Sequence, residues 1–256
     1  MTDSGNQGAK MTHIPARDRY WEIDVTRGVA IAMMILFHIL FDLTFLGIAP
    51  WPGSATFWRI FAAMTAALFL FIVGLSFTIS AAHASRSLDR KEFYLKYLKR
   101  GLGIFALGLV VTLVTWLYLG TGYVVFGILH LIGISIILAP FFYPYTWFNL
   151  IAGTGTILLG FVLWNIYGPA YLLWLGIHPE MFYSVDYTPL IPWFGVVLIG
   201  IFAGKILYPA GKKTLFADSH PPSAAGGLMF LGRHSLLIYL LHQPVIILIL
   251  TLLTMQ

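Results

Sequence analysis

Seven long apolar runs dominate this chain and limit what it can fold into. Each is close to the roughly 20 residues that an α-helix needs to cross the hydrocarbon core of a bilayer. Backbone groups inside hydrocarbon must pair within the protein, and the runs lack the alternating pattern of a membrane β-barrel. We therefore expect an all-α integral membrane protein, a bundle of about seven transmembrane helices. The runs are Gly28–Ile48, Phe57–Ser80, Leu102–Gly120, Val124–Tyr143, Thr146–Trp164, Leu190–Tyr208 and Ser235–Leu253.

The charge content agrees with a membrane location. Charged residues make up 10% of the chain and apolar residues 59%, whereas soluble domains carry about 25% charged residues. So few charges cannot cover a water-facing surface, which excludes a soluble globular enzyme and a disordered protein. The net charge of +5 lies in short loops between apolar runs, so we expect no nucleic-acid partner. The sequence has no Cys, which excludes disulfides, thiolate catalysis and Cys-ligated metals.

The two parts of the chain differ in character. Residues 1–18 are polar and lack the early apolar core of a signal peptide, so they predict a poorly ordered tail. Residues 19–256 predict a single transmembrane helical domain. Their charges and broken segments show no internal repeat of the kind that inverted-repeat transporters carry.

The basic residues predict the orientation of the bundle. If the N-terminus is cytoplasmic, all but Arg59 of the 15 Lys and Arg residues lie on the inner side. Cytoplasmic loops of membrane proteins carry such an excess of Lys and Arg. We therefore expect the N-terminus inside and the C-terminus outside, with residues 165–189 as the longest outer loop.

Polar residues inside the membrane carry the functional signal, because a titratable group in hydrocarbon is costly and usually has a function. His38 and Asp42 are four residues apart in the first run, so they share one helix face. His242 and Gln243 lie near the middle of the last run. Arg59 and His130 also fall at mid-depth or in the outer half of the membrane. We expect one cavity, open to the outer side, in which His38 is surrounded by Asp42, Arg59, His130, Asp186 and His242.

Simpler interpretations of these residues stay open. A lone membrane His often forms a hydrogen bond between helices, and Arg59 can extend to the outer interface. Imidazole and carboxylate are zinc ligands, but no H-E-x-x-H motif is present, so we expect no metal site. A proton-coupled transporter or permease also uses His and Asp at mid-membrane. A purely structural membrane protein is the third alternative.

The basic segment 84–100 has two compatible interpretations. It can be a positive-inside loop with an amphipathic helix at the interface, whose lipid-facing residues would be Phe93, Leu95 and Leu98. It can also be an entry funnel for an anionic ligand such as a nucleotide phosphate, with the point charges of Lys96, Lys99 and Arg100.

Five blocks of the sequence resemble, in order, the transmembrane acyltransferase family that heparan-α-glucosaminide N-acetyltransferase typifies. The family opens approximately as Ile-Asp-x-x-Arg-Gly-x-Ala-Ile followed by a polar residue inside the helix, which corresponds here to Ile23 through His38. The later blocks look like those of its short prokaryotic branch. The blocks are Arg19–Leu43, Leu68–Phe77, Phe126–Gly133, Asp186–Gly200 and Leu231–Pro244.

The resemblance implies an acyltransferase embedded in the lipid bilayer of a prokaryotic plasma membrane. It would use cytoplasmic acyl-CoA, usually acetyl-CoA, to modify an amine or hydroxyl of a sugar or glycoconjugate on the outer side; a homodimer is left open. His38 matches the intramembrane polar residue, and a His there is held essential in the related O-acyltransferases. Asp24 and Arg27 match a cytoplasmic block whose members could pair or help to hold CoA. Lysosomal members carry a catalytic His in the first outer loop, and residues 49–55 contain none.

The residue types suit this chemistry. His has the pKa to remove a proton from the acceptor, and a carboxylate such as Asp42 can orient and stabilise it. Arg59, His130 or a backbone N–H could stabilise the oxyanion. We expect catalytic roles for His38, Asp42 and His130, substrate binding by Arg59, Asp186, His242 and Gln243, and acyl-CoA binding by Arg27, Lys99 and Arg100.

Overall fold

The structure is a computed structural model that describes residues 20–212 and 221–254, so the predicted tail 1–18 lies outside it. The described residues form helices and two isolated β-bridges. The α-helices are α1 (Trp21–Phe45), α2 (Ala55–Ser87), α3 (Arg90–Leu119), α4 (Ile128–Phe142), α5 (Trp147–Leu163), α6 (Leu190–Leu207), α7 (Gly226–Arg233) and α8 (Ser235–Thr254). Short 3₁₀ turns are η1 (Ala170–Leu175), η2 (Pro209–Gly211) and η3 (Ser223–Ala225).

The all-helical architecture is confirmed, and each of the seven predicted runs falls on a helix. Five of these helices, α1, α2, α3, α6 and α8, are long and apolar enough to cross a membrane. The apolar helices α4 and α5 are shorter, with 15 and 17 residues. A membrane-embedded protein is therefore supported, and the count of seven spans stays a prediction.

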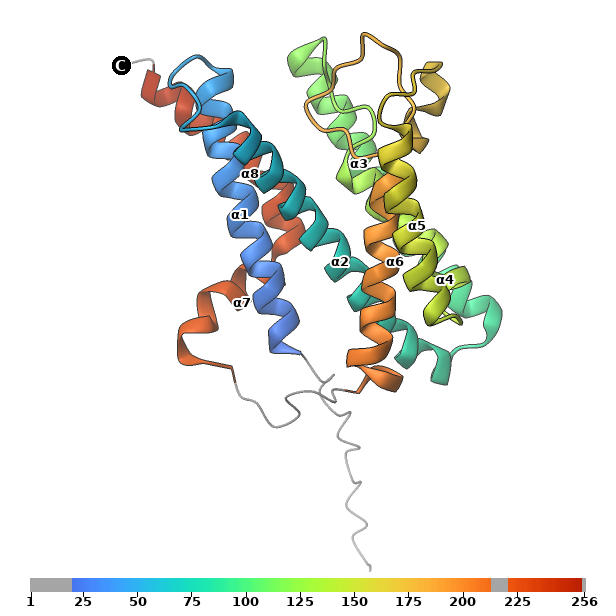
Figure 1. Cartoon of the computed structure of the whole chain (residues 1–256). Coiled ribbons are helices and arrows are strands. Elements are labelled where there is room, and N and C mark those ends of the chain that lie inside the picture. The colour runs from blue at the N-terminus through green and yellow to red at the C-terminus, as the bar shows by residue number, and fades with distance from the viewer. Residues whose placement is uncertain (1–19, 213–220, 255–256) are drawn as a thin grey trace, which may run out of the picture.

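Helix α2 crosses the bundle diagonally and joins its two sides (Figure 1). α1 packs on α2 and carries α7 and α8, and α6 packs on α2 from the other side. α5 packs on α6, and α3 packs on α4. α1 begins at the lower end of the view, and α8 ends at the upper end. Opposite ends are what the predicted topology requires, although the side that faces the cytoplasm stays a prediction.

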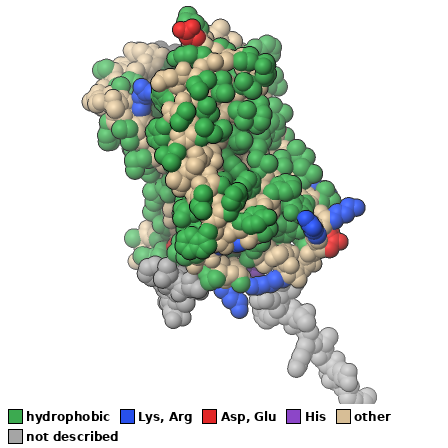
Figure 2. Space-filling view, turned by 45° about the vertical axis from the view of Figure 1, so that its right-hand side comes forward, with side chains coloured by type: hydrophobic (Ala, Val, Ile, Leu, Met, Phe, Trp, Pro, Cys, Tyr) green, Lys and Arg blue, Asp and Glu red, His purple; other side chains and the backbone are tan. Residues whose placement is uncertain are grey.

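The protein core lies where α2, α3, α4 and α6 meet. Its fully buried members include Leu70, Tyr97, Leu131, Val197 and Ile201. The outward faces of the helices are also apolar, as lipid contact requires. Figure 2 shows this band of apolar side chains over the middle of the visible face, with most of the visible Lys and Arg gathered near its lower end.

The basic segment 84–100 is helical as expected from Arg90 onward, with Leu95 and Leu98 exposed, but the loop before it is only a two-residue turn between two long helices. α2 continues to Ser87, and Asp89 caps α3 by accepting from the Glu92 N–H at 2.7 Å. The Glu92 carboxylate accepts in return from the Asp89 N–H at 3.2 Å. This reciprocal capping box satisfies two free backbone donors. Phe93 consequently packs into the protein core rather than into lipid.

Helix α7 was not predicted, because eight residues with three glycines give a weak helix signal. Glycines on both α1 and α7 instead permit the two helices to pack closely. A Cβ added at Gly28 would lie 2.0 Å from the Leu228 carbonyl oxygen. A Cβ at Gly232 would lie 1.8 Å from the Asp24 carbonyl oxygen. Both positions require glycine for α1 and α7 to approach this closely.

We predict that Gly28→Ala destabilises the fold by about 1–3 kcal/mol, because the added methyl overpacks the contact with α7. Gly103→Ala is the matched control, since nothing lies within 4 Å of a Cβ at this position in α3. That control should be neutral or stabilising by up to about 1 kcal/mol, because Ala favours a helix over Gly. Thermal unfolding in detergent measures both, and equal stability of the two variants would contradict the close contact.

Candidate active site

His38 on α1 is held in one orientation by its own helix. Its Nδ1 atom lies 2.9 Å from the Met34 carbonyl oxygen, one turn earlier. A carbonyl oxygen only accepts, so Nδ1 carries the hydrogen and Nε2 carries a lone pair. No described residue hydrogen-bonds to this Nε2 atom. The sequence predicted that Asp42 orients the ring, whereas the structure gives that role to the Met34 carbonyl.

His242 on α8 repeats this arrangement. Its Nδ1 atom lies 2.6 Å from the Tyr239 carbonyl oxygen. Its Nε2 atom is buried and has no hydrogen-bond partner among the described residues. The rings of His38 and His242 lie 4.7 Å apart at an interplanar angle of 79°. Two imidazoles on neighbouring helices thus each keep a free Nε2 lone pair.

Asp42 pairs with Gln243, the residue after His242. The Gln243 Nε2 group donates to both carboxylate oxygens, at 2.8 and 2.9 Å. Asp42 is only 2% exposed, and the Oε1 atom of Gln243 is buried without a partner in the described chain. The pair joins α1 to α8 beside the two histidines. The carboxylate remains one helical turn from His38, near enough to stabilise a charged imidazolium.

Asp186 reaches into the bundle from the loop 165–189 and caps α4. Its carboxylate accepts from the Ile128 N–H at 3.1 Å and from the Thr188 hydroxyl at 2.7 Å. Burial raises the pKa of Asp186 above its ordinary value, and these two hydrogen bonds oppose the rise. A Cβ at Gly127 would lie 2.3 Å from the carboxylate, so glycine is needed there.

His130 lies beside Asp186 and is only 2% exposed. Its Nδ1 accepts from the Gly127 N–H at 3.2 Å, and its Nε2 lies 3.4 Å from the Thr112 hydroxyl of α3. An Nδ1 that accepts places the ring hydrogen on Nε2. His130 therefore has no free lone pair, and this geometry suits holding the start of α4 better than removing a proton.

The predicted site residues thus fall into two neighbouring groups. One is the cluster of His38, Asp42, His242 and Gln243 between α1 and α8. The other consists of His130, Asp186 and Tyr239, which line a tightly packed recess beside the start of α4. A protonated His38 would lower the pKa of Asp186, so the two groups lie within electrostatic reach of each other.

The structure departs from the predicted arrangement at two residues, Arg59 and Tyr239. Arg59 is exposed in the first turns of α2 and makes no hydrogen bond or ion pair with any residue that the structure describes. Its expected position around His38 is not observed. Tyr239 was missed, although its spacing of three residues from His242 places it near the same face of α8. The outward opening of the cavity stays a prediction.

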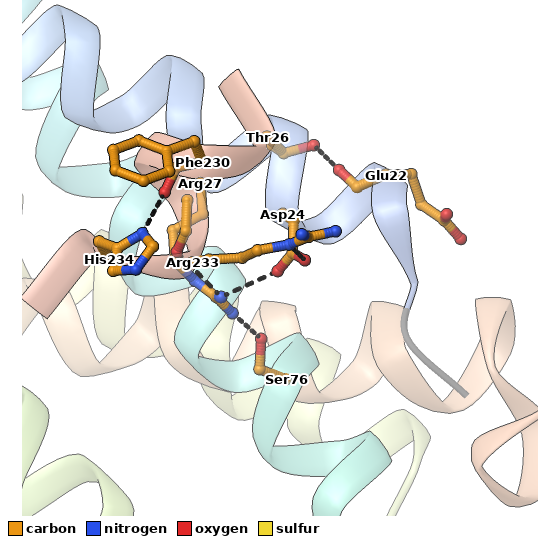
Figure 3. A network of polar contacts seen from close by, with 9 residues as sticks. Glu22, Asp24, Thr26, Arg27, Ser76, Phe230, Arg233 and His234 are labelled. Carbon is orange, nitrogen blue, oxygen red and sulfur yellow. Dashed lines mark hydrogen bonds and ion pairs between the residues drawn. The ribbon is translucent and has the colours of Figure 1, made fainter. Parts of the chain in front are cut away.

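A second polar network lies at the opposite end of α1 (Figure 3). Asp24 pairs with Arg27 at 3.5 Å and with Arg233 of α7 at 3.2 Å. Arg27 also donates to the Ser76 hydroxyl of α2 at 2.9 Å. The charge of Arg100 on α3 acts on Arg27, and Arg100 itself is exposed. The network therefore contains more positive than negative charge.

We predict that wild-type stability falls relative to Asp186→Asn as pH rises from about 4 towards neutrality. The raised pKa means that the folded state favours the protonated carboxyl, so folding loses stability as that proton leaves. His38, His130 and Tyr239 face Asp186 and are shared by both proteins. Thermal unfolding across this pH range measures the difference, and parallel curves for the two proteins would contradict it.

Comparison with known proteins agrees with the sequence resemblance. Residues 19–244 match the model of the protein family described as heparan-alpha-glucosaminide N-acetyltransferase, catalytic. The matched range contains both site groups and the network around Asp24. No curated protein and no solved structure matches the chain significantly.

Proposed function

This chain belongs to the family of heparan-alpha-glucosaminide N-acetyltransferase catalytic domains, and on that premise we propose the reaction that it performs. The family implies a membrane acetyltransferase. The proposed reaction moves an acetyl group from cytoplasmic acetyl-CoA to an amine or hydroxyl of a sugar on the outer side. The observation that carries the proposal is the facing pair of His38 and His242, each with a free Nε2 atom.

His38 is the proposed general base. Its Nε2 atom takes the proton of the acceptor N–H or O–H, and the freed electron pair attacks the thioester carbonyl carbon. The C–S bond of the tetrahedral intermediate then breaks, and the imidazolium returns the proton to the departing CoA sulfur. Asp42 stabilises the imidazolium from one turn away while Gln243 holds the carboxylate.

His242 and Gln243 are proposed to bind the acceptor. The His242 Nε2 and Gln243 Oε1 atoms are both buried acceptors without a partner among the described residues. An unsatisfied buried polar group costs about 1–3 kcal/mol. Sugar hydroxyl and amine groups are hydrogen-bond donors, so a bound sugar would relieve this cost. The same two atoms would then select for a substrate rich in donors.

The remaining outer residues have supporting roles in this proposal. His130 and Asp186 hold the start of α4 and the outer loop, and the Nε2–H of His130 would have to leave the Thr112 hydroxyl to reach an oxyanion. Arg59 is exposed on the outer part of α2, so its proposed contact with substrate is restricted to the entrance.

Acyl-CoA is proposed to enter at the end of the bundle that carries Arg27, Lys99 and Arg100. Lys99 and Arg100 are exposed, and Asp24 is shared between Arg27 and Arg233. The surplus positive charge would attract the phosphates of CoA. The pantetheine arm would then extend along the bundle towards His38.

The transporter alternative has less support. Substrate sites of secondary transporters are typically built from broken helices in repeated halves. Here α1 runs unbroken through His38 and Asp42. A liposome assay still separates the two functions, because only a transporter moves substrate without consuming acetyl-CoA.

We predict that His38→Ala lowers acetyl transfer by roughly 10²- to 10⁴-fold, the usual contribution of a general base. His38→Asn should be equally impaired, since an amide keeps hydrogen bonding but cannot take the proton. The assay follows radiolabel from acetyl-CoA into a panel of amino and neutral sugars with detergent-purified protein. A folded His38→Ala protein with near-native turnover would overturn the assignment of the base.

Asp42→Asn is the companion variant in the same assay. The introduced amide can still pair with Gln243, because the unpartnered Gln243 Oε1 atom can accept a hydrogen bond from it. The fold should therefore survive while turnover falls less than in His38→Ala. Thermal unfolding measured in parallel separates lost catalysis from lost structure.

We predict that the double charge reversal Lys99→Glu and Arg100→Glu raises the KM for acetyl-CoA several-fold and leaves kcat nearly unchanged. The increase should shrink as ionic strength rises, because salt screens phosphate contacts. Lys212→Glu is the matched control, since Lys212 is an exposed lysine outside this patch. An unchanged KM at low ionic strength would place the CoA entrance elsewhere.

A further inference from the structure

A groove of about 300 Å³ runs between α3 and α4, away from the site groups described above. It lies at the end of the bundle where α3 begins and α4 ends, the end that carries the basic residues. Its lining is Lys91, Tyr94, Leu95 and Leu98 from α3, with Ile137 and Phe141 from α4.

The groove has an apolar floor and a cationic mouth on one helix face. Lys91, Leu95 and Leu98 follow the spacing that aligns residues along an α-helix. From Lys91 to Leu98 the helix rises by roughly 10 Å, at about 1.5 Å per residue. The rings of Tyr94 and Phe141 lie 5.2 Å apart and bridge the two helices. An elongated apolar slot that ends at a lysine matches a fatty acyl chain below a charged headgroup.

The charges around the mouth favour an anion. Lys91 is exposed, and the Arg90 guanidinium lies 6.0 Å from the centre of the Tyr94 ring. The acidic groups of this turn, Asp89 and Glu92, are engaged with backbone N–H groups in the capping box and do not line the groove.

We propose that this groove binds one anionic phospholipid of the adjacent leaflet. The phosphate would lie against Lys91 and Arg90, and one acyl chain would fill the slot along Leu95, Leu98 and Phe141. The exposed face of α5 serves as a contrast. Helix α5 carries no Lys or Arg, so it offers an anionic headgroup no cationic partner of its own.

The test uses the full chain in detergent with equimolar phosphatidylglycerol and phosphatidylcholine of identical acyl chains. Native mass spectrometry counts the bound copies of each lipid. We expect wild-type protein to retain phosphatidylglycerol at least fivefold over phosphatidylcholine. Lys91→Glu should remove that preference, and Leu98→Trp should reduce the retention of both lipids by filling the slot. Lys212→Glu and Leu113→Trp are the controls, because both positions are exposed outside the groove.

Equal retention of the two lipids by wild-type protein would overturn the proposal and indicate ordinary lipid contact. An unchanged preference in Lys91→Glu would also overturn it, and this exposed substitution leaves the packing of α3 intact. A photoreactive acyl chain on phosphatidylglycerol provides a second measurement. Its crosslinks should map to peptides of α3 and α4, and crosslinks confined to other helices would contradict the assigned position.

Discussion

Asp24 forms ion pairs with both Arg27 and Arg233, and α8 begins two residues after Arg233. This shared carboxylate, with the glycine contacts between α1 and α7, therefore fixes where α8 starts along α1. The start of α8 in turn decides which of its residues meets His38. The cluster of His38, Asp42, His242 and Gln243 thus depends on an ion-pair network between α1 and α7 at the other end of α1.

The cluster of His38, Asp42, His242 and Gln243 is unusual because it leaves buried hydrogen-bond acceptors without partners among the described residues. Most buried polar atoms in proteins have a partner, and hydrocarbon offers none of the water that relieves an orphan at a protein surface. The free acceptors on His242 and Gln243 lie beside a carboxylate that no described cation pairs with. A purely structural cluster would gain stability from apolar replacements, so this arrangement favours a site that completes its hydrogen bonds with a ligand.

The sequence predicted the helices, because apolar length is a local signal, and the spacing of His38 and Asp42 placed both on one face of α1. It could not predict that Gln243 holds Asp42, since the two residues are 201 positions apart and pair only through packing. The tautomers of His38 and His130 depend on backbone groups that no side-chain pattern reveals. Helix α7 escaped prediction for a similar reason, because its stability comes from contact with α1 rather than from its own glycine-rich sequence.

The diagonal course of α2 has a consequence for the membrane itself. Its apolar run 57–80 would extend about 36 Å at 1.5 Å per residue, more than the roughly 30 Å of hydrocarbon in a bilayer. A helix of this length would relieve the hydrophobic mismatch by tilting, and both α1 and α6 pack on α2. A change in bilayer thickness would then act on α2 first, which would make lipid chain length a mechanical variable of the protein.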